Sequence, residues 1–88
     1  MSMYGAHPAQ LAHLGRSMQQ QSEAVRHVSA TITSVLQGTT WVGPARDRFE
    51  GDWNGSFRVA LDRLRDALDM AGRDCVARSV ELERVMGR

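Results

Sequence analysis

The sequence predicts an all-α fold, an antiparallel helix-turn-helix hairpin, on three observations. Apolar residues recur at alternating spacings of three and four in both halves of the chain, which places them along one face of a helix. A segment containing glycine and proline separates the two halves, and a short connection makes two helices antiparallel neighbours. The length of 88 residues allows one domain. We therefore expect a single domain over residues 1–88, with helices at about 8–37 and 45–86 and a turn at 38–44.

The first helix is predicted from its start residue and its apolar pattern. Pro8 suits a first helical position, where its missing N–H leaves no hydrogen bond unmade. The pattern has one polar member, Gln21, and its apolar members are Leu11, Leu14, Met18, Val25, Val28, Ile32 and Val35.

Glycine and proline define the predicted turn. Gly38 suits the position after a helix that requires a positive φ. Pro44 suits the start of the next helix, and it disfavours the α region for Gly43.

The second helix has a similar pattern, with Arg78 as its polar member. The other members are Leu61, Leu64, Leu68, Ala71, Cys75, Leu82 and Val85. Gly51, Gly55 and Gly72 also lie in this helix, where glycine is unfavourable by about 1 kcal/mol relative to alanine. They indicate either close approach by another helix or tolerated positions on the surface. The apolar stripe of one helix can cover that of the other only in part. We therefore expect apolar surface to remain exposed and the hairpin to form an oligomer.

Four aromatic residues gather around the turn: Trp41, Phe49, Trp53 and Phe57. The last three are four residues apart and so share one helix face. One interpretation is that they fill the end of the hairpin. The other is that Trp41, on a loop, anchors a partner, since tryptophan is enriched in interface hot spots. The two interpretations are compatible if a second chain forms half of the pocket that holds these aromatic side chains.

Composition and spacing argue against most other classes of function. The formal charge is +1, with 11 arginines and no lysine, which gives no excess of basic residues for nucleic acid. No apolar run is long enough to span a membrane, and the N-terminal residues lack the pattern of a signal peptide. His7, His13 and His27 form no metal-ligand spacing, and Cys75 has no histidine in its half of the chain. We expect no catalytic residues, no cofactor and no metal.

The residues at the turn resemble a known family. The sequence WVGPARDRFEGDW over residues 41–53, between two helices with heptad patterns, is similar to the WXG family of small type VII (ESX) secretion substrates, related to the early secreted antigenic target. The resemblance covers essentially the whole chain. It implies a hairpin that pairs with itself or a sister protein into a four-helix bundle, in which Trp41 and Gly43 are the motif residues and the loop lies beside the partner's helix end. It also implies export in the folded state by a secretion ATPase, which the dimer contacts transiently.

One feature departs from that family. Its members carry Tyr-x-x-x-Asp/Glu just beyond the second helix, whereas the one tyrosine here is Tyr4. This departure favours an alternative: a cytosolic helper that pairs with the helical N-terminal region of a larger toxin or effector. For the main interpretation we expect a protein that is cytoplasmic before export and then secreted or on the cell surface, without a cleaved signal. The all-arginine basicity suits an actinobacterial genome of high GC content.

Overall fold

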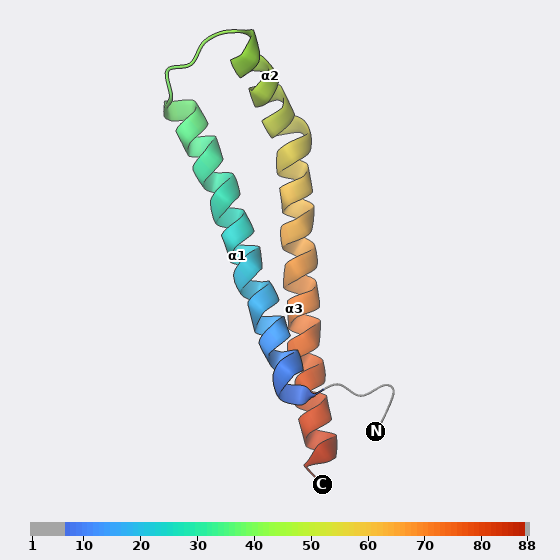
Figure 1. The fold of residues 1–88 in the computed structure, drawn as a ribbon. Helices are drawn as coiled ribbons and strands as arrows, with labels where there is room; N and C mark the ends of the chain where they lie inside the picture. The colour runs from blue at the N-terminus through green and yellow to red at the C-terminus, as the bar shows by residue number, and fades with distance from the viewer. Residues whose placement is uncertain (1–6, 88) are drawn as a thin grey trace.

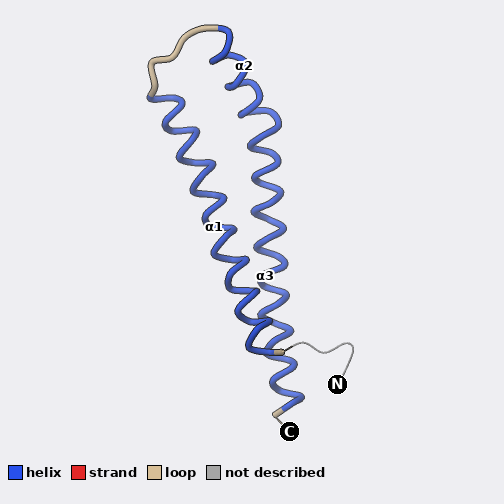
Figure 2. Tube along the Cα trace, in the orientation of Figure 1, coloured by secondary structure: helices blue, strands red, loops and turns tan. Residues whose placement is uncertain are grey.

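The computed structural model describes residues 7–87, and Tyr4 lies outside the described residues together with the rest of 1–6 and with residue 88. The described chain is helical apart from a short loop and its ends, and it folds back once on itself (Figures 1 and 2). The elements are α1 (Pro8–Gly38), α2 (Pro44–Asp52), the π-helical turn η1 (Trp53–Phe57) and α3 (Arg58–Met86). The prediction of an all-α hairpin is confirmed.

Helix α1 begins at Pro8, as expected, and runs through Gly38. The prediction that Gly38 takes a positive φ is wrong. Thr39 is extended and caps the helix instead, donating its N–H to the Leu36 carbonyl and its hydroxyl to the Val35 carbonyl (2.6 Å). With those carbonyls bonded, the helix end needs no left-handed residue. The positive φ lies at the other end of the loop, at Gly43 (135°).

The second long helix is continuous but not uniform. Pro44 is its first residue, and the Asp47 N–H donates to the carbonyl of Gly43 (3.1 Å). A regular helix was expected over 45–86, but at η1 the Arg58 N–H donates to the Trp53 carbonyl five residues back, which defines a π turn. Trp53, the first residue of that turn, is buried, so the irregular turn coincides with the aromatic contact to α1.

The two long helices pack over small residues. Gly15 of α1 and Gly72 of α3 lie at the point of closest approach, where a Cβ built on either glycine would come 2.6 Å from the other's carbonyl oxygen. One heptad along, the Ser22 hydroxyl donates to the backbone carbonyl of Arg65 (3.1 Å). Ser79 is buried at the same helix-to-helix contact. Small side chains let the backbones come this close, because nothing larger would fit between them.

These contacts fix the register of the hairpin. Gly15 lies against Gly72 and Ser22 against Arg65, pairs whose residue numbers both add to 87. Residue n of α1 is therefore level with residue 87 − n of α3. By this rule Val85 lies beyond Pro8, and Figure 1 shows the last turns of α3 running past the beginning of α1.

The hairpin is a single layer of two helices, with overall dimensions of 65 × 21 × 15 Å. Domains usually enclose a core between two packed layers. Here, among the described residues, the buried hydrophobic side chains are Ala12, Leu36 and Trp53. Within residues 7–87 no helix combines the length and the apolar character needed to cross a membrane.

Candidate protein–protein interface

The large apolar residues of both helices lie beside the helix-to-helix contact rather than in it. In α1 the contact is centred on Gly15, Ser22 and Leu36. Each of these residues follows one member of the apolar pattern by one residue and another by four, as Gly15 follows Leu14 and Leu11. In α3 it is centred on Gly72 and Ser79, with the same offset. Because the helices are antiparallel, equal offsets place both stripes on the same side of the hairpin. We call this side the apolar face; it comprises Leu11, Leu14, Met18, Gln21, Val25, Val28, Ile32, Val35, Leu61, Leu64, Leu68, Ala71, Cys75, Arg78, Leu82 and Val85.

The apolar face is open to solvent in the single chain. Its members nearer the contact are half-buried: Leu11, Met18, Val25, Leu61, Leu68, Ala71, Cys75 and Leu82. Its outer members are exposed, by 46% at Leu14, 51% at Val28, 47% at Leu64 and 72% at Val85. Ile32, Val35 and the two polar members, Gln21 and Arg78, are exposed as well. Contiguous exposed apolar surface on a helical protein indicates a surface for another protein or a membrane.

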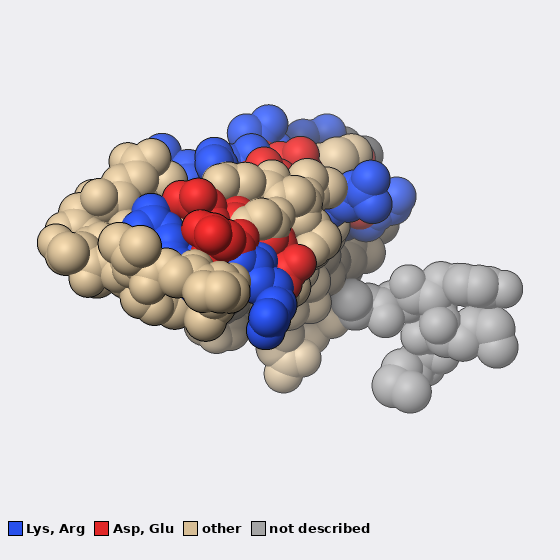
Figure 3. Space-filling model, turned by 90° about the horizontal axis from the view of Figure 1, so that it is seen from above, with Lys and Arg blue, Asp and Glu red and all other residues tan. Residues whose placement is uncertain are grey.

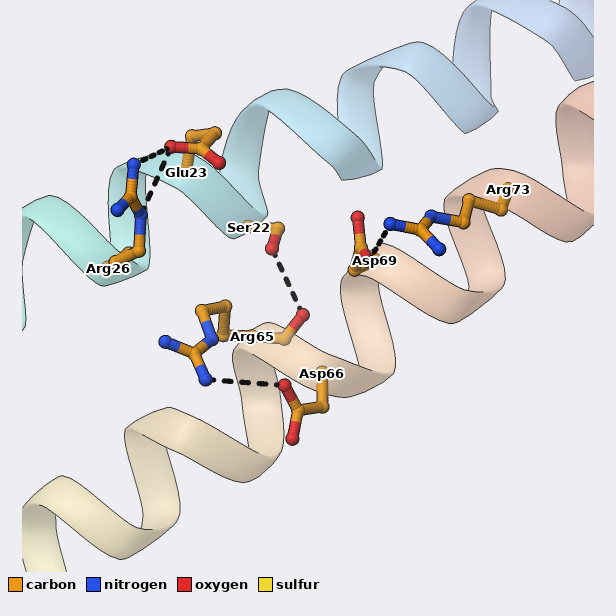
Figure 4. Close-up of polar contacts among 7 residues, drawn as sticks. All are labelled: Ser22, Glu23, Arg26, Arg65, Asp66, Asp69 and Arg73. Carbon is orange, nitrogen blue, oxygen red and sulfur yellow. Dashed lines mark hydrogen bonds and ion pairs between the residues drawn. The ribbon is translucent and has the colours of Figure 1, made fainter.

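The opposite side of the hairpin is polar. There Arg26 pairs with Glu23 (2.6 Å), and Arg73 pairs with Asp69 (3.0 Å), each within its own helix (Figure 4). Between the helices lies an open groove of about 400 Å³, lined by Arg26, Ser29, Ala30, Thr33, Ser34, Gln37, Arg58, Asp62 and Arg65. Seen from above, arginine and acidic side chains intermingle without forming a patch of one sign (Figure 3). This side therefore carries the ion pairs of Arg26 and Arg73, together with the exposed Val80.

The aromatic residues form one cluster at the loop end. Phe49 is its centre, with ring centroids 6.1 Å from Trp53, 6.4 Å from Trp41 and 6.4 Å from Phe57. Trp53 is buried, and its indole N–H donates to the Thr33 hydroxyl of α1 (2.9 Å). Phe57 and Trp41 remain 45% and 40% exposed. Trp53 thus joins the helices where they diverge, whereas Trp41 and Phe57 leave ring surface available.

Trp41 borders an apolar pocket at the loop. The pocket has a volume of about 210 Å³ and is lined by Ile32, Val35, Leu36, Thr39, Trp41 and Phe49. Arg46 fixes the loop beside it, because its guanidinium donates to the Trp41 carbonyl (2.8 Å) and to the Glu50 carboxylate (2.9 Å). The loop conformation that exposes Trp41 is therefore held by hydrogen bonds to α2.

Sequence reasoning missed two of these features. Of the three glycines singled out, Gly72 does lie at a close approach, while Gly51 and Gly55 face open space. The sequence predictions do not include Gly15, the residue that Gly72 approaches. A signal was present, since Ala12, Gly15 and Ser22 form a second stripe of small residues beside the apolar one. The predictions do not include Arg46 either, although Glu50 four residues later is a suitable ion-pair partner.

The side chains considered for chemistry do not come together. The three histidines are exposed: His13 and His27 lie on α1, and His7 lies just before it. Cys75 is half-buried near Gly15. In the part of the chain that the structure describes, no three histidine, cysteine or acidic side chains are grouped closely enough to hold a metal ion.

Comparisons with known proteins identify no relative of this chain. The chain matches no family model, no curated protein and no solved structure. The two surfaces of the molecule that bear on its function are the apolar face and the loop with its pocket.

Proposed function

We propose that this protein acts by association: the hairpin is one half of a four-helix bundle, as a WXG-like substrate or export partner of a type VII secretion system. The observation that carries this proposal is the apolar face. It runs along both helices, whereas the closest approach of the two helices is made by Gly15 and Gly72. A second hairpin laid on this face would supply the missing layer and bury both apolar stripes.

The loop supports the secretion part of the proposal. Trp41 and Gly43 are the residues that resemble the family motif, and Trp41 is partly exposed beside an apolar pocket. An exposed tryptophan next to a pocket is typical of an interface anchor. The partner is then the same chain, a sister hairpin or a larger type VII substrate, with a secretion ATPase as a transient contact. On this proposal the dimer forms in the cytoplasm and leaves the cell folded, for the medium or the cell surface.

The alternative function is a cytosolic helper that pairs with the helical N-terminal region of a larger toxin or effector. It uses the same apolar face. The feature that favours it is the absence of a Tyr-x-x-x-Asp/Glu sequence in residues 58–87, the stretch that covers α3. The two functions differ in the fate of this chain, since a substrate is exported and a helper stays behind.

The test combines association with export. We expect light scattering of the purified chain, alone or co-expressed with a related hairpin, to give the mass of a dimer at micromolar concentration. We expect Trp41→Ala to keep the helical circular-dichroism signal while reducing export of the tagged protein from an actinobacterial host with a type VII system. A monomer under both conditions would overturn association through the apolar face. Retention of the tagged protein in the cell while a co-expressed larger substrate is exported would favour the helper.

Val42→Ala is the matched control for the loop. Val42 is 91% exposed and is not among the residues that line the pocket. We expect it to behave like the unmodified chain in both assays. Equal loss of export in the two variants would show that the loop tolerates no substitution, and would remove Trp41 as a specific anchor.

A further inference from the structure

We propose that the open groove between α1 and α3, on the polar side of the hairpin, is a second docking site, and that its occupant is a helix of another protein with acidic residues along one face. The groove lies away from the apolar face, so this inference does not depend on the association proposed above. Three observations support it: the residues at the contact positions nearest the loop, the charges that line the groove, and the spacing of its arginines.

Toward the loop from the glycine crossing, two successive contact positions of α3 carry arginine. Arg65 lies level with Ser22, whose hydroxyl donates to the Arg65 carbonyl (3.1 Å). By the register of the hairpin, Arg58 lies level with Ser29, one heptad further. The helices move apart toward the loop (Figure 1). These positions therefore border an open groove instead of a close backbone contact.

The lining of the groove is basic. Arg26, Arg58 and Arg65 stand against one acidic residue, Asp62. The other lining residues are uncharged, and among them the serine hydroxyls and the amide of Gln37 can donate hydrogen bonds. Carboxylates suit such a lining, because they accept hydrogen bonds from both guanidinium and neutral donors.

The ion pairs that these arginines already make leave the groove open to an incoming carboxylate. Arg26 pairs with Glu23 (2.6 Å), with side chains 63% and 68% exposed, and Arg65 pairs with Asp66 (3.4 Å). Among residues 7–87, Arg58 takes part in no ion pair. Exposed pairs are weak, and a guanidinium has five N–H donors. A second carboxylate can therefore bind beside the first or replace it.

The spacing of the arginines matches one face of a helix. By the register of the hairpin, Arg26 is level with position 61 of α3, between Arg58 and Arg65. The steps along the groove are thus three and four positions, and the whole span of seven is about 10 Å. A helix laid along the groove presents its residues i, i+3 or i+4, and i+7 on one face with the same rise. Acidic residues at those positions would face the three guanidinium groups in turn.

The surroundings of the groove argue against a continuous polyanion as its occupant. On the side toward the glycine crossing, the surface beside Arg26 and Arg65 includes the carboxylates of Glu23, Asp66 and Asp69. Nucleic acid and anionic membrane surfaces present negative charge at every step, so these carboxylates would repel them. A helix with three or four acidic residues within about two turns fits the short basic stretch instead.

Synthetic helices test the groove in the full chain. The probe is a fluorescently labelled alanine–glutamine peptide with glutamate at i, i+3, i+4 and i+7, which serves for either direction along the groove. The control peptide has the same composition, with its glutamates distributed around the helix. In about 0.05 M salt we expect saturable binding of the probe by fluorescence anisotropy and roughly fivefold weaker binding of the control. In about 0.5 M salt we expect binding of the probe to be lost.

Charge reversal at Arg58 provides the second readout. Arg58→Glu is expected to weaken binding of the probe by roughly tenfold. One of two further peptides, with lysine in place of glutamate at i or at i+7, is expected to recover binding to this variant and not to the unmodified chain. Arg63→Glu makes the same change on an exposed position of α3 outside the groove, and is expected to leave the preference among the peptides unchanged. Circular dichroism checks that both variants remain helical.

The other outcomes overturn the site. Equal binding of the probe and the control peptide, or equal effects of Arg58→Glu and Arg63→Glu, would show attraction by overall charge only. Absence of binding in low salt, or recovery with neither lysine peptide, would also contradict a helix docked against Arg58. None of these results bears on the proposed function, because the oligomeric state and the export of the tagged protein are measured separately.

Discussion

At the scale of the residue, Gly43 and Trp41 have separate physical roles within the same motif. Gly43 has φ 135° and ψ 175°, a conformation that is essentially restricted to glycine, and its carbonyl accepts the Asp47 N–H that starts α2. Trp41 presents its ring beside the pocket while its carbonyl is bonded to Arg46. The glycine shapes the loop and the tryptophan supplies the surface.

This division predicts the effect of two glycine substitutions. Gly43→Ala should lower the free energy of unfolding by about 1–3 kcal/mol, because alanine is strained at that φ even though the space around it is open. Gly38→Ala, in helical backbone and equally open space, should leave stability unchanged or raise it by up to about 1 kcal/mol. Urea unfolding followed by circular dichroism measures both. Equal effects would refute the role of backbone strain at Gly43.

At the scale of the element, α1 and α3 each present two stripes with different uses. The stripe through Gly15 and Ser22 in α1, and through Gly72 and Ser79 in α3, makes the hairpin. The stripe of large residues lies beside this contact, half-buried or exposed. The ion pairs within the helices are mostly exposed, as between Arg78 and Asp74, and such pairs contribute little stability. The hairpin therefore depends on the closeness of its backbones.

Alanine at the crossing point tests this dependence. Gly15→Ala places a Cβ 2.6 Å from the Gly72 carbonyl oxygen, so the helices must separate, and we expect a loss of about 1–3 kcal/mol in the free energy of unfolding. Gly51→Ala, inside α2 with nothing within 4 Å, should instead gain about 0.5–1 kcal/mol. Thermal and urea unfolding of the two variants against the unmodified chain provide the measurement. Stabilisation by both substitutions would show that the crossing has room to spare.

At the scale of the whole molecule, the hairpin buries very few hydrophobic side chains. Three hydrophobic side chains are buried among the described residues, whereas thirteen large ones are exposed. If the proposed association holds, folding and association are coupled, because a second layer would supply burial that one chain lacks.

Coupling of this kind makes stability depend on protein concentration. We expect the midpoint of thermal unfolding to rise between low and high micromolar concentration, since dilution removes the partner from the folded state. We also expect 1 M salt to leave association intact, because the apolar face relies on hydrophobic contact and the ion pairs on the polar side are not part of it. A midpoint independent of concentration would show that the single hairpin is stable alone.

The sequence by itself determined the helical class, the place of the turn and the two apolar stripes. Each follows from local rules. Heptad spacing indicates which residues share a helix face, and glycine and proline indicate where one helix ends and the next begins. The same rules misplaced the positive φ at Gly38, because the hydrogen bonds of Thr39 decide how α1 ends. They also gave no sign of the π turn at Trp53.

Only the tertiary structure decided which stripe each helix offers to the other. Periodicity shows that a face is apolar but not what it touches, and the large apolar stripe was the natural candidate for the contact inside the hairpin. At the crossing of Gly15 and Gly72 that contact is made by small residues instead, because backbones this close exclude larger side chains. That choice leaves the large residues of both stripes half-buried or exposed beside the contact.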